Sequence, residues 1–234
     1  MSYRIFILAL WIRVWHWINA LLILCLIISG LSLHYAQPGA GIIKFSLARE
    51  MHNIAGIGLC LNYVYFFIGN IVSGNWWQYI PRPHGYMKRC WVQFRYYMYD
   101  IFRGAPHPFP TTVDDNFNPL QQLIYWGVMY VLMPLLILTG VTYLYPTLAP
   151  DRWFGVDGLL PVAFVHFFVA FLIFLFMLVH VYLGTTGDHL TSKISTMITG
   201  WHEEGLEELE STEQDDRIAA GAGAGANAVD APES

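Results

Sequence analysis

The sequence predicts an all-α membrane protein, a bundle of four transmembrane helices. Two observations support this fold class. First, the 234-residue chain is 56% apolar and only 12% charged, whereas an ordinary soluble domain is about 25% charged. Second, the charge deficit is concentrated in four stretches that contain no Asp, Glu, Lys or Arg: Val14–Ile43, Met51–Pro81, Asn116–Pro150 and Gly158–Gly187.

Each charge-free stretch is long enough to cross a bilayer, because a transmembrane helix needs about 20 apolar residues. We predict spans near residues 11–33, 51–72, 119–145 and 161–184, which together form one domain over residues 1–202. The alternative is a large soluble helical protein, but four such runs in so short a chain disfavour it. Within the third span, Pro134 is expected to kink the helix because proline lacks an amide hydrogen.

Lys and Arg residues are distributed unequally between the two sides of these spans, which predicts their orientation. One side holds nine of them and the other holds three. The nine are Arg4, Arg13, Arg82, Lys88, Arg89, Arg95, Arg103, Lys193 and Arg217, and the three are Lys44, Arg49 and Arg152. We therefore expect a multi-pass protein of a bacterial or archaeal cell membrane with both termini in the cytoplasm.

The net charge of −5 arises from the C-terminal segment. Residues 203–234 contain ten of the seventeen acidic residues, and Arg217 is their only basic residue. The remainder has 11 basic and 7 acidic residues, a net charge of +4, which suits a surface beside anionic lipid. The segment is acidic and rich in Gly and Ala, so we predict that it is disordered beyond about residue 215.

The three cysteines are scattered at positions 25, 60 and 90. The sequence has no C-x-x-C pair, which argues against a thioredoxin-like motif, a zinc site or covalently attached haem. It also has no glycine-rich phosphate loop and no nucleophile elbow, and nothing indicates a nucleic-acid partner. We expect no stand-alone catalytic centre in this chain.

Four of the nine histidines lie within predicted spans: His16, His52, His166 and His180. Burial of such a polar group in a membrane is costly, so each one suggests a function, although an interhelical hydrogen bond is the alternative. His166 and His180 are 14 residues apart, nearly four helical turns. They therefore face the same side of the last span, about 21 Å apart along its axis.

The order of the spans places these histidines at two depths. His16 and His180 both lie near the inner surface and are called the inner site here, and His52 and His166 lie near the outer surface and are called the outer site. Two histidines at one depth, repeated at a second depth, suit two b-type haems stacked within a four-helix bundle. An iron with two axial imidazoles has no open position, which favours electron transfer. Zinc is a poor alternative because it prefers four ligands at one point.

Two arginines have the same spacing from two of these histidines. Arg13 begins "RVWH" and Arg49 begins "REMH", and residues three apart share one face of a helix. Each arginine lies one turn closer to water than its histidine. We predict that both bind haem propionates through charge-assisted hydrogen bonds; the alternative is that they only mark the ends of spans.

These residues carry a resemblance to a known family. The "RVWHW" start, the R-x-x-H opening of the second span and the H-x13-H spacing in the last span resemble the di-haem cytochrome b subunits of respiratory complexes. That family includes the b-type subunits of nickel-iron hydrogenases, the gamma subunit of formate dehydrogenase and thiosulfate-reductase cytochrome b. The likeness covers about residues 8–200, and residues 117–141 are most similar to the last two members.

The resemblance implies the same histidine pairing and a quinone site next to the inner haem. In relatives an Asn-x-x-Gln motif borders that site, and here the motif corresponds to Asn118 and Gln121. The alternative is that Asn118 and Pro119 only cap a helix. The resemblance also implies a partner subunit with iron-sulfur or other redox centres, so that this chain would transfer electrons between that partner and the quinone pool.

A second class of function is open from the residues alone. The chain could be a haem-free membrane anchor, or a transporter subunit in which the histidines relay protons.

The long loop over residues 73–118 is rich in aromatic and basic residues. We therefore predict, for either class of function, a short helix near 87–103 that lies in the membrane interface and contacts lipid.

The orientation yields a direct test. A reporter that is active only outside the cytoplasm, fused after Ser234, is expected to stay silent because nine of twelve basic residues favour a cytoplasmic C-terminus. The same reporter inserted at residue 40, in the first outer loop, provides the positive control. Activity from the C-terminal fusion would reverse the inner and outer assignments.

Overall fold

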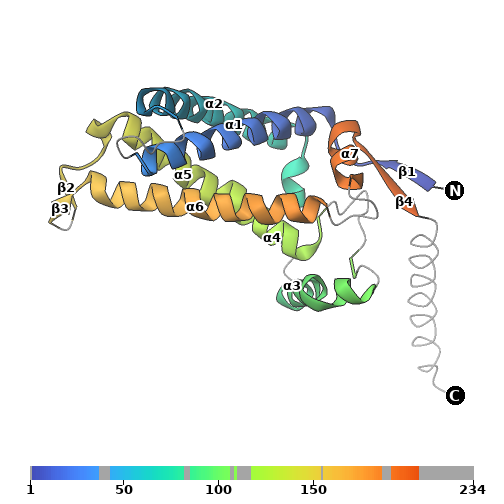
Figure 1. Cartoon of the computed structure of the whole chain (residues 1–234). Coiled ribbons are helices and arrows are strands. Elements are labelled where there is room, and N and C mark those ends of the chain that lie inside the picture. Colours follow the sequence, from blue (N-terminus) through green and yellow to red (C-terminus); the bar gives the residue numbers. More distant parts are fainter. Residues whose placement is uncertain are drawn as a thin grey trace, which may run out of the picture.

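The computed structural model contains four long apolar helical segments (Figure 1). It describes residues 2–36, 43–81, 85–105, 108–109, 117–153, 155–185 and 191–205. Each of the four segments is long and apolar enough to cross a membrane, so the predicted four-span fold class is confirmed. The segments are α1 (Leu10–His34), α2 (Phe45–Val72), the composite of α4 (Pro119–Gly127), η4 (Val128–Leu132) and α5 (Met133–Leu144), and α6 (Leu159–Gly184).

The observed helices overlap the predicted spans but differ at one end. Helix α2 begins at Phe45, before the predicted start at residue 51. Its first turns include the charged residues Arg49 and Glu50, which are exposed. A helix can extend beyond the apolar layer into water, so the absence of charge marks the membrane-embedded part and not the whole helix.

Short elements connect the spans at both ends of the bundle. At one end, β1 (Ser2–Phe6) pairs antiparallel with β4 (Trp201–Gly205), beside α7 (Ser192–Thr199). The pairing includes residues 203–205 of the acidic C-terminal segment, and the part predicted to be disordered, beyond about residue 215, lies outside the described residues. The other end holds η5 (Pro146–Leu148) and the small ribbon of β2 (Arg152–Trp153) and β3 (Val156–Asp157).

The spans are arranged as two close pairs, α1 with α2 and α5 with α6, and the two pairs contact each other sparsely. Glycines explain the close approach of the first pair. A Cβ atom on Gly69 would lie 2.8 Å from the ring of Trp11, and one on Gly58 would lie 3.0 Å from Leu22. Small residues allow helices to approach in lipid, where association depends on packing and hydrogen bonds.

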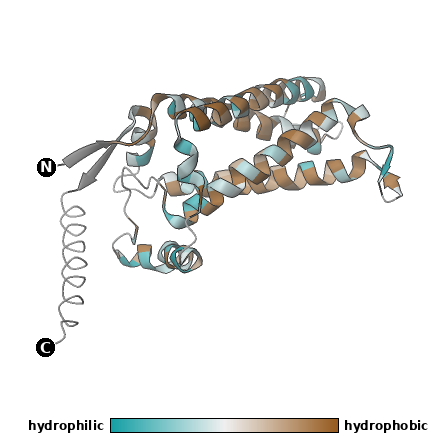
Figure 2. Cartoon of the chain, turned by 180° about the vertical axis from the view of Figure 1, so that it is seen from behind, coloured by the Kyte–Doolittle hydropathy of each residue, from teal (hydrophilic) through white to brown (hydrophobic). Residues whose placement is uncertain are grey.

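The four spans consist mainly of hydrophobic residues (Figure 2), and many of their large apolar side chains are exposed. Only 11% of the most apolar part of α6 is buried within the chain, because lipid takes the place of a protein core around it. Large side chains exposed on this helix are Leu160, Phe164, Phe167, Phe168, Phe171, Leu175, Leu178, Val179, Val181 and Tyr182.

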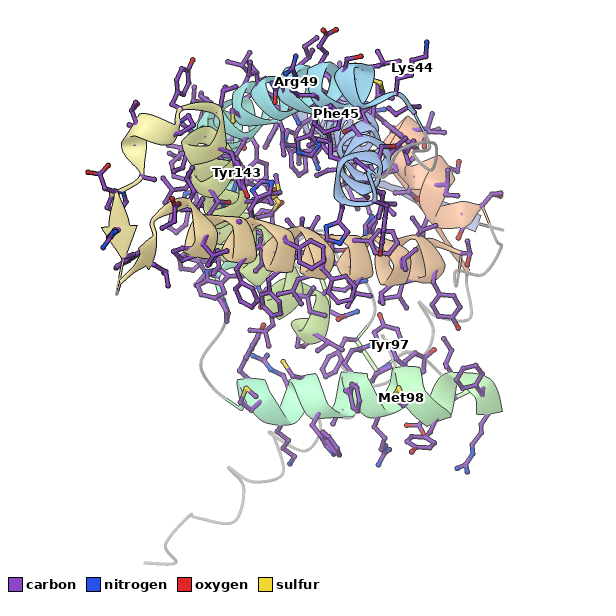
Figure 3. All side chains as sticks on the ribbon, turned by 60° about the vertical axis from the view of Figure 1, so that its left-hand side comes forward. Lys44, Phe45, Arg49, Tyr97, Met98 and Tyr143 are labelled. Atoms are coloured by element: carbon purple, nitrogen blue, oxygen red, sulfur yellow. The ribbon has the colours of Figure 1, made fainter. Side chains whose placement is uncertain are left out.

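The long loop over residues 73–118 contains the helical segment that the sequence predicts near 87–103. It is formed by α3 (Tyr86–Arg95), η2 (Tyr96–Asp100) and η3 (Ile101–Arg103). The Tyr86 hydroxyl donates to the Pro119 carbonyl at 2.7 Å, and burial raises the pKa of the Tyr86 phenol. Figure 3 shows Tyr97 between this segment and the bundle. The opposite side exposes Met87, Trp91, Phe94, Met98 and Phe102.

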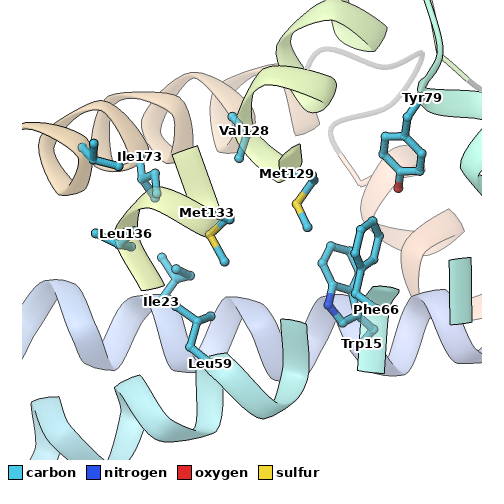
Figure 4. Packing of buried hydrophobic residues seen from close by; sticks show 11 residues of the cluster. Trp15, Ile23, Leu59, Phe66, Tyr79, Val128, Met129, Met133, Leu136 and Ile173 are labelled. Atoms are coloured by element: carbon cyan, nitrogen blue, oxygen red, sulfur yellow. The ribbon is translucent and has the colours of Figure 1, made fainter. Parts of the chain in front are cut away.

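The core of the bundle is a layer of apolar side chains from all four spans (Figure 4). Its central members are Ile23, Leu59, Met133, Leu136 and Ile173. At one end it continues into an aromatic group in which Trp15 lies 4.5 Å from Phe66 and Phe66 lies 5.8 Å from Tyr79, measured between ring centres.

The third span is interrupted directly before Pro134. Residues Val128–Leu132 form a π-helical turn, in which the Met133 amide bonds to the Val128 carbonyl. In that register the Met129 carbonyl would need a donor from residue 134, and proline has none. The Tyr63 hydroxyl donates to this carbonyl at 2.9 Å. A side chain of α2 therefore supplies the hydrogen bond that Pro134 cannot.

Tyr63→Phe should destabilise the bundle by about 1 kcal/mol, because it leaves the Met129 carbonyl without a donor in an apolar layer. The free energy of unfolding in mixed micelles measures the effect. Tyr65→Phe is the matched control, since Tyr65 lies on the same helix and is 42% exposed. Equal free energies of unfolding for the two variants would show that this hydrogen bond does not stabilise the bundle.

Candidate haem sites

The four membrane histidines meet in two pairs. The ring centres of His16 on α1 and His180 on α6 are 6.0 Å apart, and those of His52 on α2 and His166 on α6 are 6.3 Å apart. All four side chains are half-buried. These are the two pairs expected from the order of the spans, the inner site and the outer site.

The spacing within each pair fits one metal ion between two imidazoles. A transition-metal ion lies about 2 Å from the imidazole nitrogen that binds it, and that nitrogen lies about 1 Å from the ring centre. Two imidazoles on opposite sides of one ion therefore have ring centres about 6 Å apart. Among the described residues, neither pair is joined by a direct hydrogen bond between its rings. The residues present thus fit a metal ion that the two histidines of a pair would hold between them.

Helical periodicity sets the separation of the two sites. Ile173 lies seven residues, or two turns, from both His166 and His180, and it belongs to the buried layer between the sites. Ile23 has the same position on α1, seven residues after His16. An apolar layer thus separates the inner site from the outer site and excludes water between them.

The outer site is surrounded by hydroxyl groups. The Ser29 Oγ lies 3.0 Å from Nδ1 of His52, and the Thr139 Oγ1 lies 2.9 Å from Nδ1 of His166. Both hydroxyls are buried. Each is followed by a glycine, and a Cβ atom on Gly140 would lie 3.4 Å from Cε1 of the His166 ring.

The inner site has a different surrounding. The Tyr125 hydroxyl lies 3.4 Å from Nδ1 of His180, and the Phe176 ring stacks on His180 with centres 5.5 Å apart. Nδ1 of His16 is buried and has no hydrogen-bond partner within the described part of the chain. The inner histidines are therefore held mainly by ring packing.

Arg13 lies one turn before His16 and contacts the end of α7. Its Nη1 donates to the Ile198 carbonyl at 2.5 Å, and the Trp17 indole donates to the Met197 carbonyl at 3.2 Å. A cation at a helix C-terminus interacts favourably with the unpaired carbonyls there. Arg49 is exposed at the start of α2, near Lys44 and Phe45 (Figure 3).

Asn118 and Gln121 form a capping box at the start of α4. The Asn118 side chain accepts from the Gln121 amide at 2.9 Å, and the Gln121 side chain accepts from the Asn118 amide at 3.3 Å. Nδ2 of Asn118 donates to the Tyr97 hydroxyl at 2.8 Å. The capping role is thus present, and the contact with quinone stays a prediction.

Sequence reasoning missed the hydroxyl partners of the histidines. A repeat could have indicated two of them, because Ser29 is the fourth residue of "LIISG" (26–30) and Thr139 is the fourth residue of "LILTG" (136–140), each little more than one turn before the end of its helix. Zinc was considered as an alternative metal because it prefers four ligands at one point. The described residues contain no group of three or more His, Cys, Asp or Glu side chains that could hold a metal ion.

Comparison with known proteins identifies the family. Residues 8–200 match the family model described as prokaryotic cytochrome b561. The chain belongs to this family. It is therefore a membrane b-type cytochrome that binds haem b and transfers electrons, and the resemblance stated from the sequence is confirmed. The haem-free membrane anchor is not supported.

Two relatives of this cytochrome show how far the similarity extends. Cytochrome YdhU of Escherichia coli (strain K12) is 41% identical over 191 residues, which cover 82% of this chain and 72% of the relative. A protein of Azotobacter vinelandii named as a probable Ni/Fe-hydrogenase B-type cytochrome subunit is 26% identical over 212 residues, covering 81% of this chain and 85% of the relative.

Proposed function

We propose that this cytochrome binds two haems b and transfers electrons between the quinone pool and a redox partner subunit. His16 and His180 would hold the inner haem, and His52 and His166 the outer haem. The observation that carries the proposal is the pair of ring separations, 6.0 Å and 6.3 Å, at the two ends of the bundle. A bound haem iron supplies reversible one-electron chemistry.

Helix α6 is the common support of both sites. It would supply one ligand to each, and because His166 and His180 are 14 positions apart, the two ligands lie about 21 Å apart along the helix axis. The sparse contact between the pairs α1–α2 and α5–α6 is compatible with two flat groups between them. The apolar layer at Ile23 and Ile173 keeps water from the path between the sites.

Arg13 and Arg49 would bind the propionates of the inner and outer haem. Each lies three residues before a histidine, on the same helix face and closer to water. Nε of Arg13 is buried without a hydrogen-bond partner in the described residues, so this guanidinium retains a donor although Nη1 binds the end of α7. Arg49 is exposed at the start of α2. It does not share the contact that Arg13 makes with α7.

The partner would dock at the outer end of the bundle. Relatives named as Ni/Fe-hydrogenase B-type cytochrome subunits support a partner with iron-sulfur or other redox centres. The connections at that end are short, with η5 and the β2–β3 ribbon beside α6. Quinone would react at the inner end near Asn118 and Gln121, so that electrons cross the membrane through both haems.

The membrane would embed the outward faces of the spans, with both termini in the cytoplasm. The exposed stripe of Met87, Trp91, Phe94, Met98 and Phe102 on the inner loop supports contact with lipid. These residues are three or four positions apart, so they form one apolar face. Among the interleaved basic residues, Lys88 is exposed and suits anionic headgroups, whereas Arg95 pairs with Asp100 at 3.1 Å.

Single alanine variants of the four histidines test the haem assignment. His16→Ala and His180→Ala are expected to lose the same haem, and His52→Ala and His166→Ala the other one, since each haem needs both of its ligands. Redox titration of the haem absorbance in purified protein follows each component. His34→Ala is the control, because His34 stacks on Phe167 at the outer end of α1 and belongs to neither site. Loss of one component in both His16→Ala and His52→Ala would contradict the pairing.

Variants of Asn118 separate quinone binding from capping. Asn118→Ser keeps a capping oxygen but removes the amide, whereas Asn118→Ala removes both and should cost about 1 kcal/mol of helix stability. If the amide binds quinone, both variants slow oxidation of the reduced haems by a quinone analogue, with haem content unchanged. Normal oxidation in Asn118→Ser together with slow oxidation in Asn118→Ala would reduce the role of this residue to capping.

A further inference from the structure

The outer site is flanked by two equivalent turns from different helices. Residues 26–30 (LIISG) of α1 contact His52, and residues 136–140 (LILTG) of α5 contact His166. In both turns the fourth residue brings a hydroxyl to Nδ1 of the histidine, at 3.0 Å for Ser29 and 2.9 Å for Thr139. The fifth residue, Gly30 or Gly140, leaves its Cα beside the ring, since an added Cβ would lie 3.4 Å from Cε1.

Each of the two hydroxyls already donates its proton to a backbone carbonyl of its own helix. Ser29 donates to the Cys25 carbonyl at 2.6 Å, and Thr139 donates to the Leu135 carbonyl at 2.8 Å. A hydroxyl has a single proton, so towards the histidine each oxygen acts as the acceptor. The bond therefore runs from Nδ1–H of the histidine to the hydroxyl oxygen. Both outer imidazoles are thus held with the proton on Nδ1, which leaves the lone pair on Nε2 as the free ligand atom.

We propose that Ser29 and Thr139 are positioning residues of the outer haem site. They fix the ring orientation and tautomer of His52 and His166, and by accepting from Nδ1–H they make both imidazoles more basic ligands. A more basic ligand favours the ferric over the ferrous state, so the pair lowers the reduction potential of the outer haem. The inference rests on the bis-histidine ligation proposed above.

The inner site provides an internal reference. The Tyr125 hydroxyl lies 3.4 Å from Nδ1 of His180, which is longer than either hydroxyl contact of the outer site. Nδ1 of His16 has no hydrogen-bond partner in the described residues. The inner haem therefore lacks the paired hydroxyl acceptors. Changes at Ser29 and Thr139 should act on the outer haem alone.

The variants Ser29→Ala and Thr139→Val, singly and together, remove the acceptors without adding charge. Thr139→Ser keeps the hydroxyl. Two matched controls lie on the same helices. Ser32→Ala removes a buried hydroxyl that, among the described residues, donates to the Ile28 carbonyl one turn earlier and contacts no histidine. Thr142→Val removes a hydroxyl that donates to the Leu138 carbonyl.

Potentiometric titration of the haem absorbance is the readout, with the outer component assigned by its absence in His166→Ala. We expect the outer midpoint potential to rise in both single variants and further in the double variant, with the inner potential unchanged. Release of the outer haem to an acceptor protein should be about 10- to 100-fold faster. Thr139→Ser, Ser32→Ala and Thr142→Val should keep the original outer potential.

Three outcomes would overturn the inference: an unchanged outer potential in the double variant, an equal shift of both haems, or the same shift in Ser32→Ala. These outcomes are distinguishable from failure of the proposed function. If the unmodified protein contains two haems that the histidine variants remove pairwise, a null result here overturns only the role of Ser29 and Thr139.

Discussion

The structure depends on one constraint: an imidazole inside a membrane needs a partner, because hydrocarbon offers it none. Four histidines meet this constraint in two pairs, each with ring centres about 6 Å apart and no direct hydrogen bond between its rings among the described residues. That separation leaves room for one metal ion between the rings. The rest of the bundle holds His16 against His180 and His52 against His166 across different helices.

Lipid provides no hydrophobic driving force between helices, so other interactions fix this geometry. Gly69 allows Trp11 to pack directly on α2, which sets the relation of α1 to α2 and hence of His16 to His52. The Tyr63 hydroxyl compensates for Pro134 at the π-helical turn, which links α2 to the third span. The polar contacts of helix α6 come from its two histidines: His166 contacts Thr139 and His180 contacts Tyr125, both on the third span.

Much of this arrangement follows from the sequence. The four spans are predictable from the absence of charge, and the pairing of His166 with His52 follows from a 3.6-residue repeat and alternating span direction. The roles of Ser29, Thr139 and Arg13 were not predictable in the same way. Serine and threonine in membrane helices commonly bond their own backbone, and only the packing of α1 on α2 brings Ser29 to His52. Likewise, the contact of Arg13 with Ile198 joins residues 185 positions apart.

The most direct test of the central claim is the haem content of the purified full-length protein combined with its electron paramagnetic resonance spectrum. Haem extracted and quantified against protein should give two haems b per chain, and the oxidised protein should show two low-spin ferric signals typical of two axial imidazoles. One haem per chain, or a high-spin signal from an iron with an open position, would contradict the assignment of His16, His52, His166 and His180 as two pairs of axial ligands.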